Sequence, residues 1–212
     1  MSILKALVLT VLLFSSSVFA DFQSTLRLAN QGDATAQVTL GYIYDAGQGV
    51  TQDHIEAARL YRLSANQGNM YGQFNLGLDY EAGQGVKQDY EEAARLYRLA
   101  ADQGAAGAQS SLAGLYTWSG HGVTQDNEEA LRLYRLSANQ GSASGQYGLG
   151  WMYENGRGVK QDLKEALRLY RLSATQGHPD AKARLNEINK NTPTARPKSK
   201  VTKNNDPLNI RD

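Results

Sequence analysis

The chain has 212 residues, of which 41% are hydrophobic and 20% charged, so it contains enough apolar side chains for a globular core. The formal net charge is +1, but residues 21–189 carry 15 Lys and Arg against 19 Asp and Glu, which argues against nucleic-acid binding. The absence of cysteine excludes disulfides, thiolate metal sites and cysteine nucleophiles.

The first 20 residues have the pattern of a cleavable signal peptide. Lys5 precedes an apolar run from Ala6 to Phe14, and small residues follow up to Ala20. The run is shorter than the roughly 20 apolar residues that a membrane-spanning helix needs. We therefore expect cleavage after Ala20, no stable membrane insertion of the mature chain, and a periplasmic or secreted location.

A nine-residue string, LYRLSANQG at 60–68, organises the rest of the chain. Close copies occupy residues 96–104, 133–141 and 169–177, and a partial copy ends at Gly32. The closing glycines are spaced by 36, 36, 37 and 36 residues, a period typical of solenoid arrays. The predicted units are an N-terminal capping helix at 21–32, repeats at 33–68, 69–104, 105–141 and 142–177, a C-terminal capping helix at 178–189, and a disordered basic tail at 190–212.

Each repeat is predicted to contain two helices joined by a glycine hinge. The first helix covers roughly 34–46 in the first repeat, where apolar residues spaced by four form one face. The Gly-x-Gly-Val hinge permits the positive φ values that end a helix. The second helix begins after Asp53 with Glu56 three residues later, the pattern of a reciprocal capping box. Two small positions on each first helix are expected to let a neighbouring helix backbone approach. They are Ala36, Gly72, Ala108 and Gly145, together with Gly41, Gly77, Ala113 and Gly150.

The repeats resemble the Sel-1-like repeat family, which is related to tetratricopeptide arrays. The resemblance rests on Ala-x-x-x-Leu-Gly-x-x-Tyr from Ala36 to Tyr44, the hinge at 47–50, and the Ala, Tyr and Gln-Gly positions of the second helix. It covers residues 33–177, with Ala113 in place of a glycine and one residue inserted in the third hinge. It implies an all-α, right-handed α/α superhelical solenoid that binds proteins or peptides, as envelope, secretion or host-contact adaptors do.

The sequence offers no convincing catalytic, metal or cofactor site. His54, His121 and His178 lie far apart, and none is at ligand spacing from another histidine or a paired carboxylate. The repeated glycine hinges lack the Gly-Lys-Ser/Thr of a phosphate-binding loop. We therefore expect a protein that is not an enzyme and uses no cofactor.

A second stripe on each first helix is the candidate binding surface. By analogy with tetratricopeptide arrays it faces the concave side, and it combines aromatic side chains, typical interface anchors, with carboxylates that favour Lys- or Arg-bearing peptides. The candidate partner-binding residues are Tyr42, Asp45, Tyr71, Phe74, Leu78, Glu81, Trp118, Tyr147, Trp151 and Glu154. In the competing interpretation, Val38, Phe74 and Tyr147 pack between adjacent first helices.

The second helices carry two rows of arginines that could meet an acidic partner. A glutamate precedes each member of the first row by three residues, which favours a neutralised, solvated face. The eight arginines are Arg59, Arg62, Arg95, Arg98, Arg132, Arg135, Arg168 and Arg171.

The favoured hypothesis is an exported, monomeric scaffold that binds a protein or peptide partner in its concave groove. The alternatives are a cell-wall or β-lactam-like ligand binder or hydrolase, and a structural spacer in an envelope assembly.

Overall fold

The computed structural model describes residues 21–118 and 123–191. The predicted signal peptide, His121, Gly120 and the segment from residue 192 onward lie outside the described residues. Within the described residues the chain is helical and contains no strand, which confirms the predicted all-α solenoid.

The helices follow one another in pairs, one pair to each repeat. Residues 21–30 are helical and precede the first pair. The labelled helices are α2 (Ala34–Ala46), α3 (His54–Asn66), α4 (Met70–Ala82), α5 (Tyr90–Asp102), α6 (Ala106–Thr117), α7 (Asn127–Asn139), α8 (Ala143–Asn155), α9 (Leu163–Thr175) and α10 (Pro179–Asn191).

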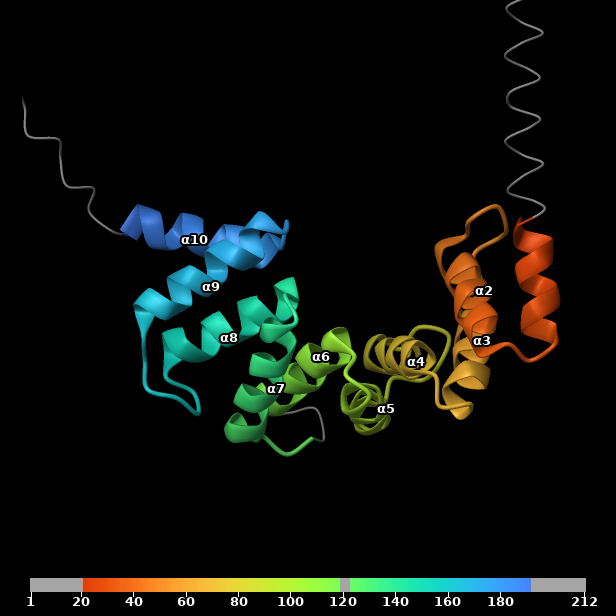
Figure 1. Cartoon of the computed structure of the whole chain (residues 1–212), viewed down its shortest axis with the longest axis horizontal. Helices are drawn as coiled ribbons and strands as arrows, with labels where there is room; N and C mark the ends of the chain where they lie inside the picture. The colour runs from red at the N-terminus through yellow and green to blue at the C-terminus, as the bar shows by residue number, and fades with distance from the viewer. Residues whose placement is uncertain (1–20, 119–122, 192–212) are drawn as a thin grey trace, which may run out of the picture.

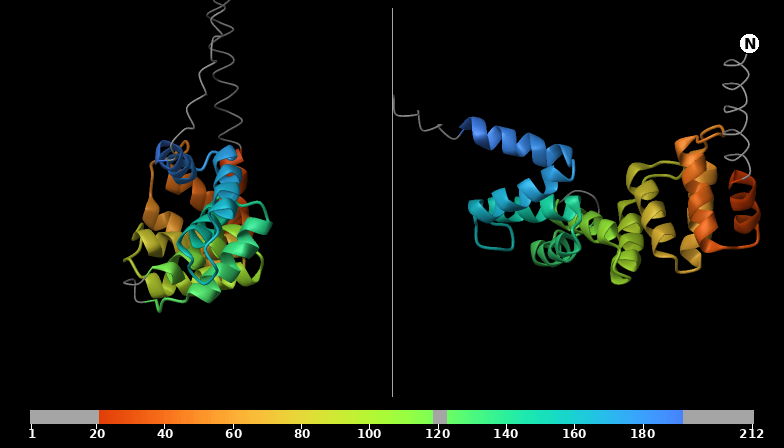
Figure 2. Two further views of the ribbon diagram at one scale, coloured as in Figure 1. Left: turned by 90° about the vertical axis from the view of Figure 1, so that its left-hand side faces the viewer. Right: turned by 45° about the horizontal axis from the view of Figure 1, so that its top comes forward.

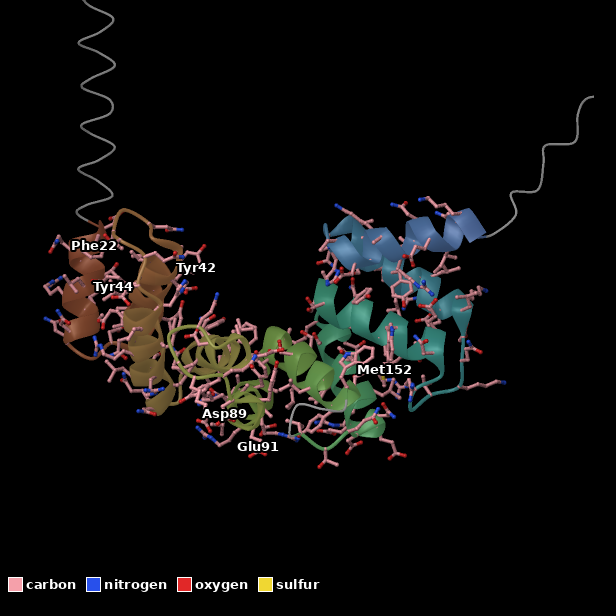
Figure 3. All side chains as sticks on the ribbon, turned by 180° about the vertical axis from the view of Figure 1, so that it is seen from behind. Phe22, Tyr42, Tyr44, Asp89, Glu91 and Met152 are labelled. Atoms are coloured by element: carbon pink, nitrogen blue, oxygen red, sulfur yellow. The ribbon has the colours of Figure 1, made fainter. Side chains whose placement is uncertain are left out.

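The pairs are arranged in an arc, with α2 and α3 near one end and α9 and α10 at the other (Figure 1). The helix of residues 21–30 covers the first end and α10 covers the last, as two further views show (Figure 2). Phe22 and Tyr44 pack in the same cluster between that first helix and α2 (Figure 3). The α10 helix runs to Asn191, two residues beyond the predicted end of the cap.

The second helix of each repeat begins with an aspartate cap, but the expected reciprocal bond is not made. Asp53 accepts hydrogen bonds from the backbone N–H groups of Ile55 and Glu56, as predicted. The Asp53 N–H donates to the carbonyl of Tyr44, so it has no need of the glutamate. The Glu56 carboxylate instead pairs with Arg59, and the other three repeats repeat this arrangement. The reciprocal half of the capping-box prediction is therefore wrong.

The hinge glycines have the left-handed backbone that the sequence predicts. Gly47 ends α2 at φ 64° and ψ 34°. Gly85 has φ 65°, and a Cβ atom there would lie 2.0 Å from the backbone oxygen of His54 in the preceding repeat. The second hinge therefore packs directly on the start of α3, which only glycine permits.

A tyrosine ring, not a helix backbone, fills the space beside most of the glycines in the middle of the first helices. A Cβ atom at Gly41 would lie 2.6 Å from the ring of Tyr61, and one at Gly77 would lie 2.6 Å from the ring of Tyr97. Gly150 receives Tyr170 in the same way. The expectation of close backbone approach is therefore wrong at these positions, because the ring of the paired helix intervenes.

Close backbone approach does occur at Gly72 and Gly145, the other small positions for which the sequence predicted it. A Cβ atom at Gly72 would lie 2.6 Å from Ser64 Oγ and 2.7 Å from the Ala65 nitrogen of the preceding repeat. Ser64 Oγ also donates to the Ala34 carbonyl at 2.8 Å, which fixes its helix against α2. The glycine thus leaves room for a serine that ties the two helices of a repeat together.

A glutamine pair connects the helices within each repeat, and its member on the first helix is buried while the other is exposed. Gln67 Nε2 donates to Gln37 Oε1 at 2.8 Å, and the same contact recurs in the other three repeats. Because buried polar groups cost stability unless they are hydrogen-bonded, these pairs favour one relative placement of the two helices. Within the described residues, no helix is both long enough and apolar enough to span a bilayer.

Candidate functional site

A groove of about 440 Å³ crosses the inner helices of repeats 2 to 4. Five of the ten candidate residues line it, and they come from α4, α8 and the start of the third hinge. These five are Phe74, Leu78, Trp118, Tyr147 and Trp151. In Figure 1, α4 and α6 lie nearer the hollow side of the arc than α5 and α7, so the groove opens on the side expected for the stripe.

The hollow of this groove is created by small side chains on α6. Gly107, Ser110 and Gly114 occupy the positions that Tyr71, Phe74 and Leu78 take on α4, and the first two line the groove. The α8 helix has Tyr147 and Trp151 at the last two of these positions. Larger side chains from α4 and α8 therefore flank a low centre.

Aromatic side chains form the walls on both sides of the hollow. Phe74 leans over Gly107, where a Cβ atom would lie 2.9 Å from its ring, and its ring centroid is 5.8 Å from that of Tyr97. The rings of Trp118 and Trp151 are tilted at a centroid distance of 4.8 Å. Trp118 keeps 53% of its surface exposed. Phe74 thus both packs between first helices, as the competing interpretation expected, and borders the groove.

Tyr147 closes the C-terminal side of the groove through contacts with the cap. Its ring stacks on His178 with a centroid distance of 4.8 Å and an interplanar angle of 20°. It also contacts Tyr170, with centroids 5.6 Å apart. Burial, followed by the nearby Asp180 carboxylate, raises the pKa of Tyr147. Both His178 and Asp180 line the groove, although the stripe argument did not include them.

Tyr134 also lines the groove, and its position differs from that of the tyrosines in the other repeats. Ala113 stands where those repeats have glycine, so its methyl group takes the space that their rings use. The Tyr134 ring lies instead against Gly148 of repeat 4, where a Cβ atom would be only 2.1 Å away. Ala113 replaces the glycine of the other repeats, and Gly148 replaces larger residues at its own position. These two substitutions were the sequence signal that could have predicted the different position of Tyr134.

The carboxylates of the stripe have different partners in different repeats. Asp45 lies 2.6 Å from His54 Nδ1, and the Glu81 carboxylate accepts a hydrogen bond from the Tyr97 hydroxyl. Glu154 accepts from Tyr170 and pairs with Arg184 of α10 at 2.5 Å. Repeat 3 has Thr117 at this position, with its Oγ1 donating to the Ala113 carbonyl.

These partners determine how much charge each carboxylate offers to a ligand. Burial would raise the pKa of Glu154, but the hydrogen bonds from Arg184 and Tyr170 bring it below the usual value. The cation of Arg184 also balances the negative charge of Glu154. Glu81 has no ion pair within residues 21–118 and 123–191, so its charge is not balanced in this way.

The two remaining aromatic candidates lie outside the groove. Tyr42 and Tyr71 are both more than half exposed, at 55% and 56%. Neither lines the groove, although Tyr42 is on an exposed side of α2 (Figure 3). The structure thus gathers the repeat 2 to repeat 4 part of the stripe and leaves its N-terminal part as separate side chains.

Asp79 is an unexpected buried acid next to the stripe. It is 4% exposed and replaces the apolar residues Leu115 and Met152 of the later repeats. Its Oδ2 atom has no hydrogen-bond partner in the structure. Burial, with a smaller contribution from Asp45 that His54 opposes, raises its pKa to about 7. Its hydrophobic counterparts in the other repeats were a sequence signal that the stripe argument did not use.

The arginine rows on the second helices are largely satisfied by neighbouring groups. The first row forms ion pairs with the glutamates three residues earlier, at N–O distances of 2.6 to 2.7 Å, as predicted. In the second row, Arg62 donates to the Tyr80 hydroxyl at 2.9 Å, and Arg98 donates to Tyr116 and Glu129 of the next repeat. Within the part of the chain that the structure describes, no three His, Asp or Glu side chains are grouped as a metal site.

Known proteins with similar sequences and structures identify the repeat. The Sel1 repeat model matches residues 34–69, 71–104, 106–142 and 143–178. A protective antigen of uropathogenic Escherichia coli strains, which displays an SLR fold, is 36% identical with a TM-score of 0.70; the match covers 79% of this chain and 36% of that chain. The present chain therefore spans about a third of that antigen's length.

Two further solved structures extend the likeness. A Sel1 repeat protein from Oxalobacter formigenes is 31% identical with a TM-score of 0.66, and the match covers 79% of this chain and 74% of that one. An immunity protein from Pseudomonas aeruginosa is 25% identical with a TM-score of 0.54, over 76% of this chain and 59% of that one. No curated protein sequence matches the chain. The repeat matches, which cover more than half of the sequence, show that the chain belongs to the Sel1 repeat family.

Proposed function

We propose that this protein is an exported, non-enzymatic scaffold that binds a protein or peptide partner in the groove across repeats 2 to 4. Sel1 repeat proteins generally act as protein-interaction modules, which supports the class of function. The observation that carries the proposal is the convergence of Phe74, Leu78, Trp118, Tyr147 and Trp151 on one groove.

The composition of the groove supports a macromolecular ligand better than a reaction. Its walls are aromatic and its floor is made of glycine and serine, with hydroxyl groups that can bind a peptide backbone. Aromatic side chains that surround a desolvated hollow are typical hot spots of protein interfaces. The Ser110 hydroxyl donates to backbone carbonyls of its own helix, which makes it a poor nucleophile.

Two of the related proteins have a stated role. One is a protective antigen and another is an immunity protein. The leader at residues 1–20 supports export, and we propose that the mature chain begins at Asp21 and acts as a monomer in the periplasm or outside the cell. Cell fractionation followed by mass spectrometry of the N-terminal peptide tests this location; an N-terminus at Met1 in the cytoplasmic fraction would contradict it.

Site-directed photo-crosslinking in the native host tests the groove. A photoreactive phenylalanine analogue is introduced at Ser144, an exposed groove residue, and in a second variant at Ile55, which is 73% exposed and outside the groove. We expect one partner to be captured from Ser144 and not from Ile55, and mass spectrometry identifies it. The capture should be lost when Trp151 is also changed to alanine, while Leu163→Ala leaves it unchanged.

Other outcomes separate the competing functions. Equal capture from Ser144 and Ile55 would place the interaction outside the groove. No capture from either position would contradict the binding function and favour a spacer. A Tyr42→Ala or Tyr71→Ala variant that weakens the capture would add the N-terminal part of the stripe to the binding surface.

A further inference from the structure

The groove is uncharged in its centre, and no lysine or arginine is among the described residues that line it. The centre is formed by the small residues of α6 and the flanking aromatic rings. Such a surface accepts a bulky apolar side chain, because moving apolar surface from water into an apolar pocket is favourable. The charge of the ligand must therefore be selected by the groups at the two ends.

Glu81 provides a negative charge at the α4 end. It follows Leu78 by three residues, so it lies on the same face of the helix. Its carboxylate accepts a hydrogen bond from the neutral Tyr97 hydroxyl, and no cation pairs with it among the described residues. The phenol orients this carboxylate but leaves its charge available.

Asp180 provides a second negative charge at the α10 end. It lines the groove, is exposed, and has no ion pair within the described ranges. It lies two residues after His178, whose ring stacks on Tyr147 in the groove wall. The nearby Glu154 differs, because its side chain is only 11% exposed and is paired with Arg184. Asp180 therefore lines the groove from α10, and Glu81, which does not itself line the groove, lies one helical turn beyond Leu78 on α4.

We infer that the groove binds an extended peptide segment in which a bulky apolar side chain lies between two basic residues. The apolar side chain enters the hollow over α6, and the basic side chains reach Glu81 and Asp180. The exposed ring of Trp118, which packs against the half-buried Trp151, adds cation–π attraction for a lysine or arginine at the rim. This inference rests on the proposed function, since it names the class of partner for the same groove.

The two tryptophans give a site-specific reporter. The chain has only two tryptophans, and both line the groove. Tryptophan-free peptides can therefore be titrated while the protein's own emission is followed. The probe is acetyl-Ser-Lys-Gly-Phe-Gly-Lys-Ser-amide, compared with a peptide that has Glu in place of both Lys and with one that has Ala in place of Phe.

We expect the Lys–Phe–Lys peptide to change the emission with a Kd at least tenfold lower than that of either comparison peptide. Asp180→Asn and Glu81→Gln should each weaken its binding about threefold, because each removes one charge contact with a partly exposed group. Gln retains an acceptor for Tyr97, and circular dichroism verifies the fold. Glu91→Gln is the matched control, since Glu91 is exposed at the start of α5 on the outer edge of the arc (Figure 3).

Equal binding of the Lys and Glu peptides would overturn the charge requirement while leaving an apolar groove. Equal binding of the Phe and Ala peptides would overturn the apolar requirement. No change in emission with any peptide would overturn the whole inference. Partner capture from Ser144 is an independent result, so a failure of this inference is distinguishable from a failure of the proposed function.

Discussion

Repeats 2 and 3 have the same pair of helices but use their inner positions differently. In repeat 2, Gly77 receives the Tyr97 ring, whose hydroxyl reaches Glu81. In repeat 3, Ala113 takes the glycine position, and Tyr134 packs on Gly148 of the next repeat. Tyr97 thus packs within its own repeat, whereas the equivalent Tyr134 connects repeat 3 to repeat 4.

The comparison separates the positions that build the array from those that shape the groove. The aspartate caps and glutamine pairs are the same in both repeats, because each satisfies backbone or buried polar groups. The stripe positions are large in repeat 2 and small in repeat 3, which leaves the hollow over α6. In repeat 3, the different packing of Tyr134 therefore occurs together with the hollow in the groove over α6.

The largest expected effect comes from making Gly148 larger. Gly148→Ala places a methyl group where the Tyr134 ring lies, and we expect a loss of about 3 kcal/mol in unfolding free energy. Adding Ala113→Gly opens the space that the tyrosine ring occupies in the other repeats, so Tyr134 can move there. The double variant should therefore be more stable, by at least about 1 kcal/mol, than the sum of the two single effects. Urea unfolding measures both values.

Gly114→Ala is the control for this comparison. It lies on α6, and a Cβ atom there would be 3.7 Å from the Tyr134 hydroxyl, an ordinary contact. This variant should be neutral or more stable by up to about 1 kcal/mol, because alanine favours helix more than glycine. Strict additivity of Gly148→Ala and Ala113→Gly would show that the two sites are not coupled through Tyr134.

The next effect concerns Asp79, for which repeat 3 has Leu115. The folded protein holds the Asp79 proton up to a pKa of about 7, whereas the unfolded chain loses it near 3.8. The unfolded state therefore releases this proton first as the pH rises, and unfolding free energy falls between about pH 4 and 7. This fall in unfolding free energy should be on the order of 2 kcal/mol, and it should be absent from the Asp79→Leu variant.

Thermal unfolding at pH 4 and pH 8 measures the Asp79 effect. The stabilising effect of Asp79→Leu should be larger at pH 8 than at pH 4. Asp102→Leu, at an exposed acid of α5, serves as the control for a change of net charge. An equal gain at both pH values would contradict the raised pKa.

A smaller effect is expected at the serine that ties the helices together. Ser137→Ala removes the hydrogen bond to the Ala106 carbonyl at 2.8 Å and should cost about 1 kcal/mol in urea unfolding. Repeat 2 has Ala100 at this position and Ala108 at the position of Gly145. Repeat 4 shows that a serine fits in this setting, because Ser173 bonds to the Ala143 carbonyl although Ala181 stands at the position of Gly145. Ala100→Ser should therefore stabilise the protein by up to about 1 kcal/mol. An Ala100→Ser variant without any gain would contradict this account.

The smallest effect is expected on the outer face, where the two repeats are alike. Arg95 pairs with Glu92, and Arg132 pairs with Glu129, both on exposed helix surfaces. Arg95→Gln should cost only about 0.3 kcal/mol and should lose this effect in high salt. Arg98→Gln is the comparison, because Arg98 bridges to Tyr116 and Glu129 of the next repeat and should cost more. Equal costs would show that the inter-repeat contacts add nothing.

The array itself could be predicted from local patterns. The spacing of the glycines, the aspartates before the second helices and the apolar faces all recur four times, and each acts within a few residues of its own position. The missing cap at Ala105 and the left-handed hinge glycines follow from the same local reasoning. The half-exposed stripe was recognisable as well, because its register on the helix follows from a period of 3.6 residues.

Contacts between repeats could not be predicted from these patterns. Glu154 pairs with Arg184, and Tyr147 stacks on His178, so both contacts join repeat 4 to the C-terminal cap. The burial of Asp79 likewise could not be predicted from its own repeat. Such contacts depend on how far each helix pair rotates relative to the next, which no single repeat specifies. For this reason the sequence pattern treats Asp45, Glu81, Thr117 and Glu154 as equivalent positions, although their partners in the structure differ.

The sequence by itself determined the helix pairs, their order and the residues that cap and close each repeat, because these features depend on backbone conformation and on neighbours within one period. Only the tertiary structure decided which stripe residues share a groove and which carboxylates remain without a cation. Tyr134 illustrates the physical reason. Its ring has two possible pockets, beside residue 113 or beside Gly148, and the methyl group of Ala113 leaves only the second open.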